Sequence, residues 1–508
     1  MKFNNNIKEV NKIENYEGGE AFVMSPELEL YSAVVTASLE DKFYETNKFL
    51  IHRIVNLISK VDPMFVAQLA IYTRTQMYMR SVPLLLLVEL AKIHRGDDLL
   101  SRAVEKTVLR ADEITELLAC YQSRNDSGND AKKLAKLSKQ IQFGLQRSFN
   151  KFDEYQFAKY DRDSAEVKLR DALFLVHPKA KDDAQQIIFD KIANRNLATP
   201  YTWETELSAL GKMDFESDEQ RNDAFRMKWE ELIDSGKLGY MALLRNLRNI
   251  LVSNVDYAHI EKVCKTIADS NAVINSKQLP FRYLSAYREI SEINSVSTSL
   301  VLSALEDAVD VSAQNIKGFG HDTKVLLACD VSGSMQRSIS PRSKVELYDI
   351  GLMLSMLLKN RCSQVISGMF GNIWKVVNLP SDGILANVTE LHRREGEVGY
   401  STNGYLVIDW LTKNNVVMDK VMMFTDCQMW DSYGNNKKTV RKSWEKYKEI
   451  APDAKLYLFD LSGYGTTPLS TDDNDVCLIS GWSDKVFEIL DALENDGSVV
   501  EEIRKIVV

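Results

Sequence analysis

The spacing of apolar residues changes once along this 508-residue chain, near residue 316. From about residue 25 to about residue 310 apolar residues recur at helical spacing, separated by short polar breaks such as Val61–Asp62–Pro63. Beyond Gly318 and Gly320, apolar strand patterns alternate with helical ones. Such alternation is typical of a doubly wound parallel sheet with helices on both faces. The length also exceeds what one hydrophobic core usually serves, so the sequence predicts two main domains.

We therefore expect a flexible segment over residues 1–20, a helical domain over 21–315 and an α/β domain over 316–508. Successive helices joined by short turns favour an α-solenoid for the helical domain. The fold class predicted is thus mainly α plus α/β.

Composition narrows the possible functions. The net charge of −9 argues against an overall basic nucleic-acid coat but is compatible with a local basic surface. The six cysteines are scattered without Cys-x-x-Cys pairs, as expected in a reducing cytoplasm. The N-terminus lacks the apolar core of a signal peptide, and the most apolar run, residues 82–88, is too short to span a bilayer. We expect a cytoplasmic protein without a membrane partner.

A polar motif follows the apolar run Leu326–Leu327–Ala328–Cys329, which has the pattern of a buried strand. Asp330, Ser332 and Ser334 then fall on the loop at the carboxyl end of that strand, where α/β sheets place their ligands. A carboxylate and two hydroxyls are hard donors of the kind that Mg²⁺ prefers. Alone, the motif would fit a helix N-cap equally well.

Two later segments favour a metal site. Lys420–Asp426 is a second strand pattern that ends in a carboxylate, and Thr402 lies on a turn-rich loop ahead of an apolar helix. Together these three loops resemble the metal-ion-dependent adhesion site of von Willebrand factor A domains, which binds one divalent ion, usually Mg²⁺. The resemblance implies the ligands Asp330, Ser332, Ser334, Thr402 and Asp426. Where that family often has an Asp after the Thr, this chain has Asn403.

The helical domain contains local basic segments. Over residues 131–141, Lys132, Lys136 and Lys139 share the helical face opposite the apolar stripe. No acidic residue lies between Asp130 and Asp153, so these lysines are candidate phosphate contacts. They would also fit the solvated face of an ordinary surface helix.

A second basic segment interleaves cations with an aromatic residue and a histidine. Lys159 and Arg162 flank Tyr160 and are followed by Lys168, Arg170 and His177. Such a mixture can supply phosphate contacts, base stacking and a directional hydrogen bond. Taken alone, His177 would also suit a helix end, hydrogen-bonded to carbonyl groups.

A third segment pairs an apolar stripe with two arginines. On a helix, Arg245 and Arg248 share one face, as do Asn246 and Asn249.

These segments resemble the TROVE domains of bacterial homologues of the Ro autoantigen, which precede a von Willebrand factor A domain. The resemblance rests on the following segments: Asn15–Phe22, Ser25–Leu30, Lys159–Tyr160, Leu169–Asp171, Val176–Lys179, Ala242–Leu247 and Leu279–Arg282. It extends over essentially the whole chain. It implies a ring-like array of HEAT-type helical repeats with a positively charged central hole.

The resemblance also implies a function. In that family the ring binds small noncoding Y RNAs on its outer surface and single-stranded ends of misfolded RNAs in the hole. Lys159 and Arg162 would contact phosphates, and His177 would make a directional contact. We therefore expect a non-catalytic RNA-binding protein that acts in RNA quality control or as a scaffold for an exoribonuclease.

Two other classes of function stay open. In the first, the α/β domain is a Mg²⁺-dependent adaptor whose bound ion docks an acidic side chain of a protein partner. In the second, the protein is a Mg²⁺-dependent hydrolase with Asp330 as nucleophile. No paired general base and no glycine-rich phosphate loop accompany Asp330 in the sequence, which disfavours the hydrolase.

Overall fold

The computed structural model describes the following residues: 12–37, 47–125, 137–162, 164–276, 278, 280–314, 321–339, 343–362, 364–378, 380, 382–434, 438–471, 475–481 and 499–508. The chain forms two compact units. Unit 1 comprises Met1–Leu50 and Gly239–Val499, and unit 2 comprises Ile51–Leu238 and Val500–Val508. This division differs from the predicted boundary near residue 316, which itself lies outside the described residues.

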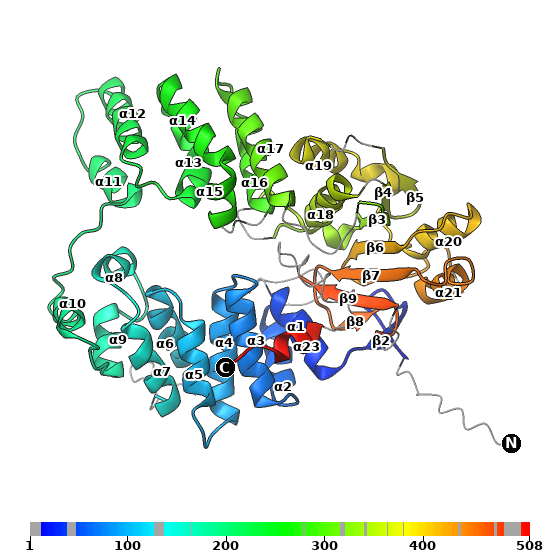
Figure 1. The fold of residues 1–508 in the computed structure, drawn as a ribbon, viewed down its shortest axis with the longest axis horizontal. Coiled ribbons are helices and arrows are strands. Elements are labelled where there is room, and N and C mark those ends of the chain that lie inside the picture. Colours follow the sequence, from blue (N-terminus) through cyan, green and yellow to red (C-terminus); the bar gives the residue numbers. More distant parts are fainter. Residues whose placement is uncertain are drawn as a thin grey trace. The chain divides into compact units, whose positions relative to one another are not determined.

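Unit 2 is an array of helices in which many helices that are close in the sequence pack against one another (Figure 1). Its helices, preceded by α2 (Asn47–Ile58) at the edge of the unit, are α3 (Pro63–Thr75), α4 (Ser81–Ile93), α5 (Leu99–Thr107), α6 (Asp112–Asn125), α7 (Lys139–Phe149), α8 (Glu154–Tyr160), α9 (Leu169–Val176), α10 (Asp183–Ala193), α11 (Trp203–Leu210) and α12 (Asp218–Asp234).

The polar breaks seen in the sequence start these helices. Asp62 accepts a hydrogen bond from the Met64 amide at the N-terminus of α3, and Pro63 occupies the first turn, where its missing N–H costs nothing. Asp182 caps α10 and Ser217 caps α12 in the same way.

The last residues of the chain also belong to unit 2. Helix α23 (Val499–Arg504) buries Ile503, and the Gln68 side chain donates hydrogen bonds to the carbonyls of Arg504 (2.7 Å) and Ile506 (3.0 Å). Arg102 of α5 donates to the Val508 carbonyl at 3.1 Å. Residues 500–508, expected in the α/β domain, therefore pack on helices of the array.

Unit 1 combines helices with a sheet. Its elements are β1 (Lys12–Glu14), β2 (Glu20–Val23), α1 (Pro26–Val35), α13 (Tyr240–Val252), α14 (Tyr257–Ala268), α15 (Ser270–Ser276), α16 (Pro280–Ser291), α17 (Thr298–Gln314), β3 (Lys324–Asp330), η1 (Gly333–Met335), α18 (Leu347–Arg361), β4 (Gln364–Phe370), β5 (Trp374–Val376), α19 (Ile384–Arg393), η2 (Glu395–Val398), α20 (Tyr405–Lys413), β6 (Lys420–Thr425), α21 (Val440–Tyr447), β7 (Lys455–Asp460), β8 (Thr466–Thr467) and β9 (Val476–Ser480).

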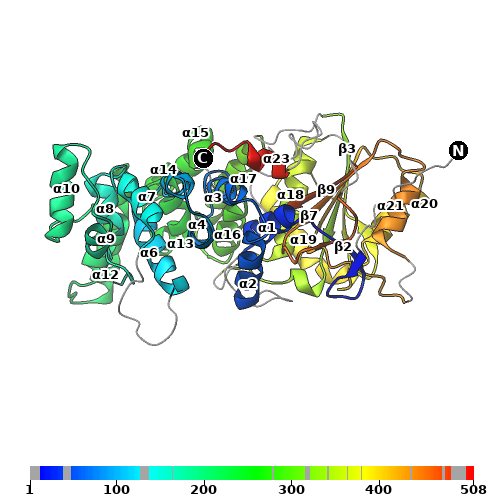
Figure 2. The same cartoon turned by 90° about the horizontal axis from the view of Figure 1, so that it is seen from below.

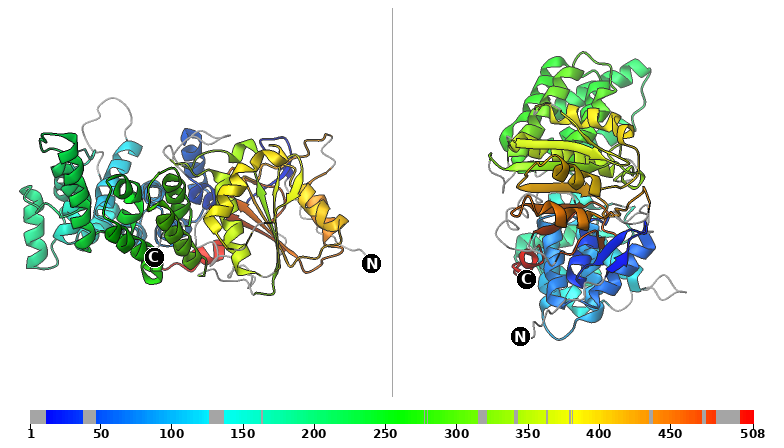
Figure 3. Two further views of the ribbon diagram at one scale, coloured as in Figure 1. Left: turned by 90° about the horizontal axis from the view of Figure 1, so that it is seen from above. Right: turned by 90° about the vertical axis from the view of Figure 1, so that its right-hand side faces the viewer.

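The main sheet has the strand order β5-β4-β3-β6-β7-β9, parallel except for the edge strand β5. Helices α18 and α19 lie on one face, and α20 and α21 lie on the other (Figures 2 and 3). Because side chains alternate along a strand, Met423 packs in the core under α20 and α21, whereas Phe424 meets Gly351 of α18. The predicted fold class, helical followed by doubly wound α/β, is confirmed.

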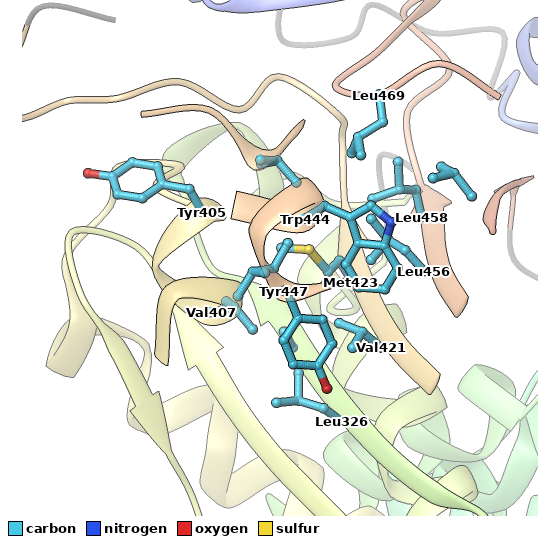
Figure 4. Close-up of a cluster of buried hydrophobic side chains, with 14 of the residues drawn as sticks. Leu326, Tyr405, Val407, Val421, Met423, Trp444, Tyr447, Leu456, Leu458 and Leu469 are labelled. Atoms are coloured by element: carbon cyan, nitrogen blue, oxygen red, sulfur yellow. The ribbon is translucent and has the colours of Figure 1, made fainter. Parts of the chain in front are cut away.

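The core on the α20 and α21 side is apolar and closely packed (Figure 4). Leu326, Val421 and Leu456 come from three neighbouring strands and contact the aromatic residues Trp444 and Tyr447 of α21. The buried Tyr447 hydroxyl donates to the Val416 carbonyl (3.1 Å) and accepts from the Met418 amide (2.9 Å), so its polar group stays satisfied.

Helices α16 and α17 are joined to this sheet domain by buried polar contacts. Arg288 of α16 donates two hydrogen bonds, at 2.7 and 2.6 Å, to the fully buried carboxylate of Asp349 on α18. Glu306 of α17 accepts from the Leu385 and Ala386 amides at the start of α19. Removing one partner of a buried charge pair is costly, so the Arg288–Asp349 contact ties α16 firmly to α18 within unit 1.

Candidate functional site

The predicted metal ligands lie at a topological switch point of the sheet. Strand β3 has β4 on one side and β6 on the other, and ligands of α/β sheets bind outside the carboxyl ends of such a strand pair. Asp330 is the last residue of β3, and Asp426 follows the last residue of β6. The loops that carry Asp330, Ser332, Ser334, Thr402 and Asp426 are called the metal loops below.

The first metal loop is held by hydrogen bonds to Asp330. Asp330 Oδ1 accepts a hydrogen bond from the Ser332 amide (2.9 Å), and Asp330 Oδ2 accepts one from the Thr425 hydroxyl (2.7 Å). The Ser332 and Ser334 hydroxyl oxygens are 3.2 Å apart, and all three side chains are buried. Three oxygen donors of the predicted set are thus brought together.

Asp426 has an oxygen without a partner. Its Oδ1 accepts from the Gln428 amide at 3.1 Å, whereas its buried Oδ2 has no hydrogen-bond partner among the described residues. Burial raises the pKa of Asp426, the charge of Asp330 raises it further, and the nearby Ser334 hydroxyl partly offsets the rise. Burial also raises the pKa of Asp330.

These residues fit a divalent cation. A cation would supply the missing partner of Asp426 Oδ2 and would offset the repulsion between two buried carboxylates. Within the described residues, no cluster of three His, Cys, Asp or Glu side chains is placed to hold a metal. Hydroxyl oxygens would therefore complete this site, as hard cations such as Mg²⁺ allow.

The third metal loop is tied to the loop after β6. The Thr402 hydroxyl donates to the Gln428 carbonyl at 3.0 Å. The fully buried Asn403 side chain donates to the Ser432 hydroxyl (2.7 Å) and accepts from the Ser432 amide (2.9 Å). The Asn that replaces the family's frequent Asp thus joins two loops.

The N-terminal residues pack against the loop after β6, which carries Asp426. In the turn between β1 and β2, the Asn15 side-chain amide donates a hydrogen bond to the Met429 carbonyl (2.8 Å). The Tyr16 backbone N–H donates to Gln428 Oε1 (2.8 Å). Strand β2 pairs with β8, and a Cβ added to Gly19 would lie 2.3 Å from the Met429 oxygen. Residues 12–20, expected to be flexible, are therefore part of the α/β domain, and sequence reasoning missed this role.

A second candidate site lies in unit 2. A hollow of about 760 Å³ is bounded by the end of α8, the following loop, the start of α9 and the segment from α10 to α11. We call it the basic pocket, because five cationic side chains line it: Lys159, Arg162, Lys168, Arg170 and Arg195. Its acidic lining residues are Asp161 and Glu204. The predicted contacts Lys159 and Arg162 thus share one site.

The wall of the basic pocket formed by residues 195–205 is anchored. Glu154 accepts hydrogen bonds from Lys191 (2.7 Å) and from the Ala198 amide (3.0 Å), and these bonds lower the pKa of Glu154. Thr205 donates to the Pro200 carbonyl at 2.8 Å and forms a capping box with Thr202. The pocket is therefore preformed.

His177 and Lys139 lie elsewhere. His177 is the left-handed C-cap of α9, with φ of 51°, and it is absent from the pocket lining. Since α9 has eight residues, its two ends are roughly 12 Å apart. Gln142 donates to the Val176 carbonyl (3.1 Å) and accepts from Lys139 (3.0 Å), which places Lys139 on the His177 side.

The other predicted contacts are not gathered with these. Lys132 and Lys136 lie outside the described residues. Arg245 and Arg248 are exposed on α13 in unit 1. Burial and the nearby charge of Arg245 lower the pKa of Arg282 on α16, so Arg282 and Arg245 form a pair of neighbouring cations there.

Sequence reasoning noted two further cations of the basic pocket without assigning them a contact, and it missed a third. Lys168 and Arg170 continue the basic run after Arg162, and this run was the available signal. Arg195 stands alone between two asparagines after a helix, so nothing local connects it to Lys159.

Comparison with known protein families shows which family this chain belongs to. The TROVE domain family matches residues 29–224 and 195–305, and the Ro60 vWA domain matches residues 324–493. The chain belongs to the TROVE-domain family. The helices of both units up to α17 are thus TROVE helices, and the sheet domain carries the metal loops in a vWA fold.

Curated relatives share parts of this TROVE protein. "Telomerase protein component 1" of Rattus norvegicus is 23% identical over 320 residues, 48% of this chain and 12% of the relative. "RNA-binding protein RO60" of Caenorhabditis elegans is 23% identical over 277 residues, 52% of this chain and 41% of the relative. The chain therefore spans less than half the length of these relatives.

A solved structure shows the same fold. The Ro (RSR) protein of Deinococcus radiodurans superimposes with a TM-score of 0.61 and 16% identity, covering 93% of this chain and 100% of that one. No helix among the described residues is long and apolar enough to cross a membrane.

Proposed function

We propose that the TROVE domain binds RNA through the basic pocket, without cleaving it. The observation that carries this proposal is the gathering of five cations around one preformed hollow in an otherwise acidic chain. Lysine and arginine contacts to phosphates supply most of the affinity of such sites. The name of the Caenorhabditis elegans relative, an RNA-binding protein, supports the same class of ligand.

The bound RNAs would be small noncoding, Y-like RNAs and the single-stranded ends of misfolded RNAs. His177 and Lys139 would extend the contact surface along α9. A role in RNA quality control, an exoribonuclease partner and residence in the cytoplasm are parts of the same proposal.

A mobility-shift titration tests the RNA proposal. The probe is a structured RNA with a free single-stranded 3′ end, and the variant combines Lys159→Ala, Arg162→Ala and Arg195→Ala. A Lys60→Ala and Arg221→Ala double variant, changed at exposed cations of unit 2 outside the pocket lining, serves as control. Loss of affinity in the first variant alone supports the proposal. Equal RNA affinity of both variants would show that the basic pocket is not the binding site. Absence of binding by the wild-type protein at every salt concentration would reject the RNA-binding proposal.

A second function is favoured by Asp426 Oδ2, a buried oxygen with no hydrogen-bond partner among the described residues. The metal loops would hold Mg²⁺ through Asp330, Ser332, Ser334, Thr402 and Asp426, and an acidic side chain of a protein partner would complete its coordination. The test is a pull-down with the Asp330→Ala variant, which should lose the partner while keeping RNA affinity. Retention of the partner would reject this docking site.

The partners of the two carboxylates disfavour hydrolysis. Asp330 and Asp426 accept hydrogen bonds from hydroxyls and backbone amides, and none of the bonds seen comes from a histidine or lysine base. RNA incubated with the purified protein and Mg²⁺ should therefore stay intact. Cleavage that disappears with Asp330→Asn would overturn the non-catalytic assignment.

A further inference from the structure

We propose that helices α3 and α5 form a peptide-binding groove, which holds residues 500–508 of its own chain and can exchange them for the same residues of a second copy. Residues 500–508 are called the strap below. The strap follows unit 1 in the sequence but belongs to unit 2, so the groove and its occupant lie in one unit. The proposal is independent of RNA binding and of the metal loops.

Helix α3 contributes a buried donor to the groove. The Gln68 side chain belongs to a residue that is 8% exposed, and it donates hydrogen bonds to the carbonyls of Arg504 (2.7 Å) and Ile506 (3.0 Å). A carboxamide nitrogen carries two hydrogens, so these two bonds use its whole donor capacity. Because a buried donor needs a partner, Gln68 favours an occupied groove.

Helix α5 contributes two cations to the same groove. Lys106 donates to the Val507 carbonyl at 2.8 Å, and Arg102 donates to the Val508 carbonyl at 3.1 Å. An ion pair with Asp98, at 3.1 Å, orients the Arg102 side chain. The two helices thus bind the strap by side-chain donors on backbone carbonyls, as a protein holds a peptide ligand. Carbonyls are common to all peptides, so the selectivity must come from elsewhere.

Two apolar side chains of the strap supply this selectivity. Ile503 is fully buried and Val508 is 9% exposed, whereas Val507 is 76% exposed. Burial of apolar side chains is the main favourable term in such binding. The groove therefore fits a peptide with two apolar anchors five positions apart and accessible carbonyls between and after them.

A second copy of the chain supplies that peptide without any new chemistry. Its strap would make the same contacts, so only the tether distinguishes binding within one molecule from binding between two, as in domain swapping. A tethered segment acts at a local concentration of about 1 mM. If the strap occupies its own groove about nine-tenths of the time, a vacant groove should bind the strap of another molecule with a dissociation constant of about 100 µM.

Two full-length variants test the exchange. Ile503→Asp places a charge at a buried anchor, which should release the strap and leave the groove vacant. The triple variant Gln68→Ala, Arg102→Ala and Lys106→Ala keeps the strap but loses the donors of the groove. When the two are mixed at about 300 µM each, about half of the molecules should pair one to one. Sedimentation equilibrium should then give a mean mass above that of either variant alone.

Val507→Asp is the matched control for Ile503→Asp, because the Val507 side chain is exposed and only its carbonyl binds Lys106. Its own strap should stay bound, so its affinity for the triple variant should be about tenfold weaker. Trypsin cleavage after Lys505 reports release directly and should be about tenfold faster in Ile503→Asp than in Val507→Asp. Ile503→Ala, a milder change, should pair with the triple variant to a smaller extent.

A free peptide with the sequence of the strap completes the experiment. It should dissociate the mixed dimer, and the same peptide carrying Ile503→Asp should leave the dimer intact. Absence of pairing in the mixture would overturn the proposal, as would a dimer that the free peptide does not dissociate. Equal trypsin cleavage of Ile503→Asp and Val507→Asp would also overturn it, because Ile503 would then not anchor the strap.

Discussion

At the metal loops Asp330 and Asp426 are fully buried, whereas Lys159, Arg162 and Arg195 at the basic pocket are exposed to solvent. The buried carboxylates repel one another and are positioned by short hydrogen bonds, so that site depends on local packing. The exposed cations act at longer range and tolerate small movements, but salt screens them. The two sites should therefore respond to different perturbations.

The largest difference should appear with salt. If four cations of the basic pocket contact phosphates, RNA affinity should fall about 50-fold between about 50 and 200 mM salt. The variant lacking Lys159, Arg162 and Arg195 should show a slope shallower by about two in a plot of log affinity against log salt. Mobility-shift titrations give both values. An unchanged slope would show that the phosphates are bound elsewhere, and Asp330→Ala should leave the whole curve unaltered.

Packing should matter only at the metal loops. In Gly19→Val the added Cβ meets the Met429 carbonyl at 2.3 Å, so the free energy of unfolding should fall by about 1–3 kcal/mol. Gly396→Val, where a Cβ would meet only the Tyr400 hydroxyl at 3.5 Å, is the matched control. Urea denaturation measures both. If the two variants unfold alike, the N-terminal turn does not support the loop that carries Asp426.

Magnesium should stabilise the protein through the metal loops. At Mg²⁺ concentrations about tenfold above the dissociation constant, stability should rise by about 1.4 kcal/mol. Asp426→Asn removes one of the two buried charges and should abolish this rise, because the ion loses its strongest ligand. Thermal unfolding with and without Mg²⁺ measures the effect. If Mg²⁺ raised the stability of the variant by the same amount, the ion would bind at a site other than the metal loops.

The smallest effect on metal binding is expected from Asn403→Asp. The carboxylate can still accept from the Ser432 amide, and the Ser432 hydroxyl can turn to donate to it. Both hydrogen bonds survive, but a carboxylate at this fully buried position loses its hydration, so without Mg²⁺ the free energy of unfolding should fall by about 1–3 kcal/mol. The added negative charge beside the loops should tighten Mg²⁺ binding about threefold. Calorimetric titration gives the affinity, and weaker binding would mean that the Asn side chain positions Thr402.

Local sequence patterns revealed the strand-end loops but not what surrounds them. Apolar runs that stop at Asp330 and Asp426 placed both residues at the carboxyl edge of the sheet, because strand ends are a short-range property. The contact between Tyr16 and Gln428 joins residues 412 positions apart, so no periodicity could indicate it. The role of Asp330 and Asp426 as metal ligands stays a prediction.

The basic pocket shows the same limit. Lys159 and Arg162 are neighbours in sequence and were found together, whereas Arg195 reaches them only through the packing of the segment after α10 on Glu154. The compact units follow a different division from the predicted domains for a related reason. Arg288 and Glu306 bind residues of α18 and α19, and these pairings depend on tertiary structure rather than on composition.

The pairing of the first strands with a late part of the chain has a consequence during synthesis on the ribosome. The Tyr16 amide is made 412 residues before its partner Gln428, a delay of roughly 20 to 80 s at ordinary elongation rates. Over this interval β2 has no β8 to pair with, so its edge is open to other strands. A nascent chain that stalls before residue 428 would therefore expose this edge, and chaperones or degradation would have to act on it there.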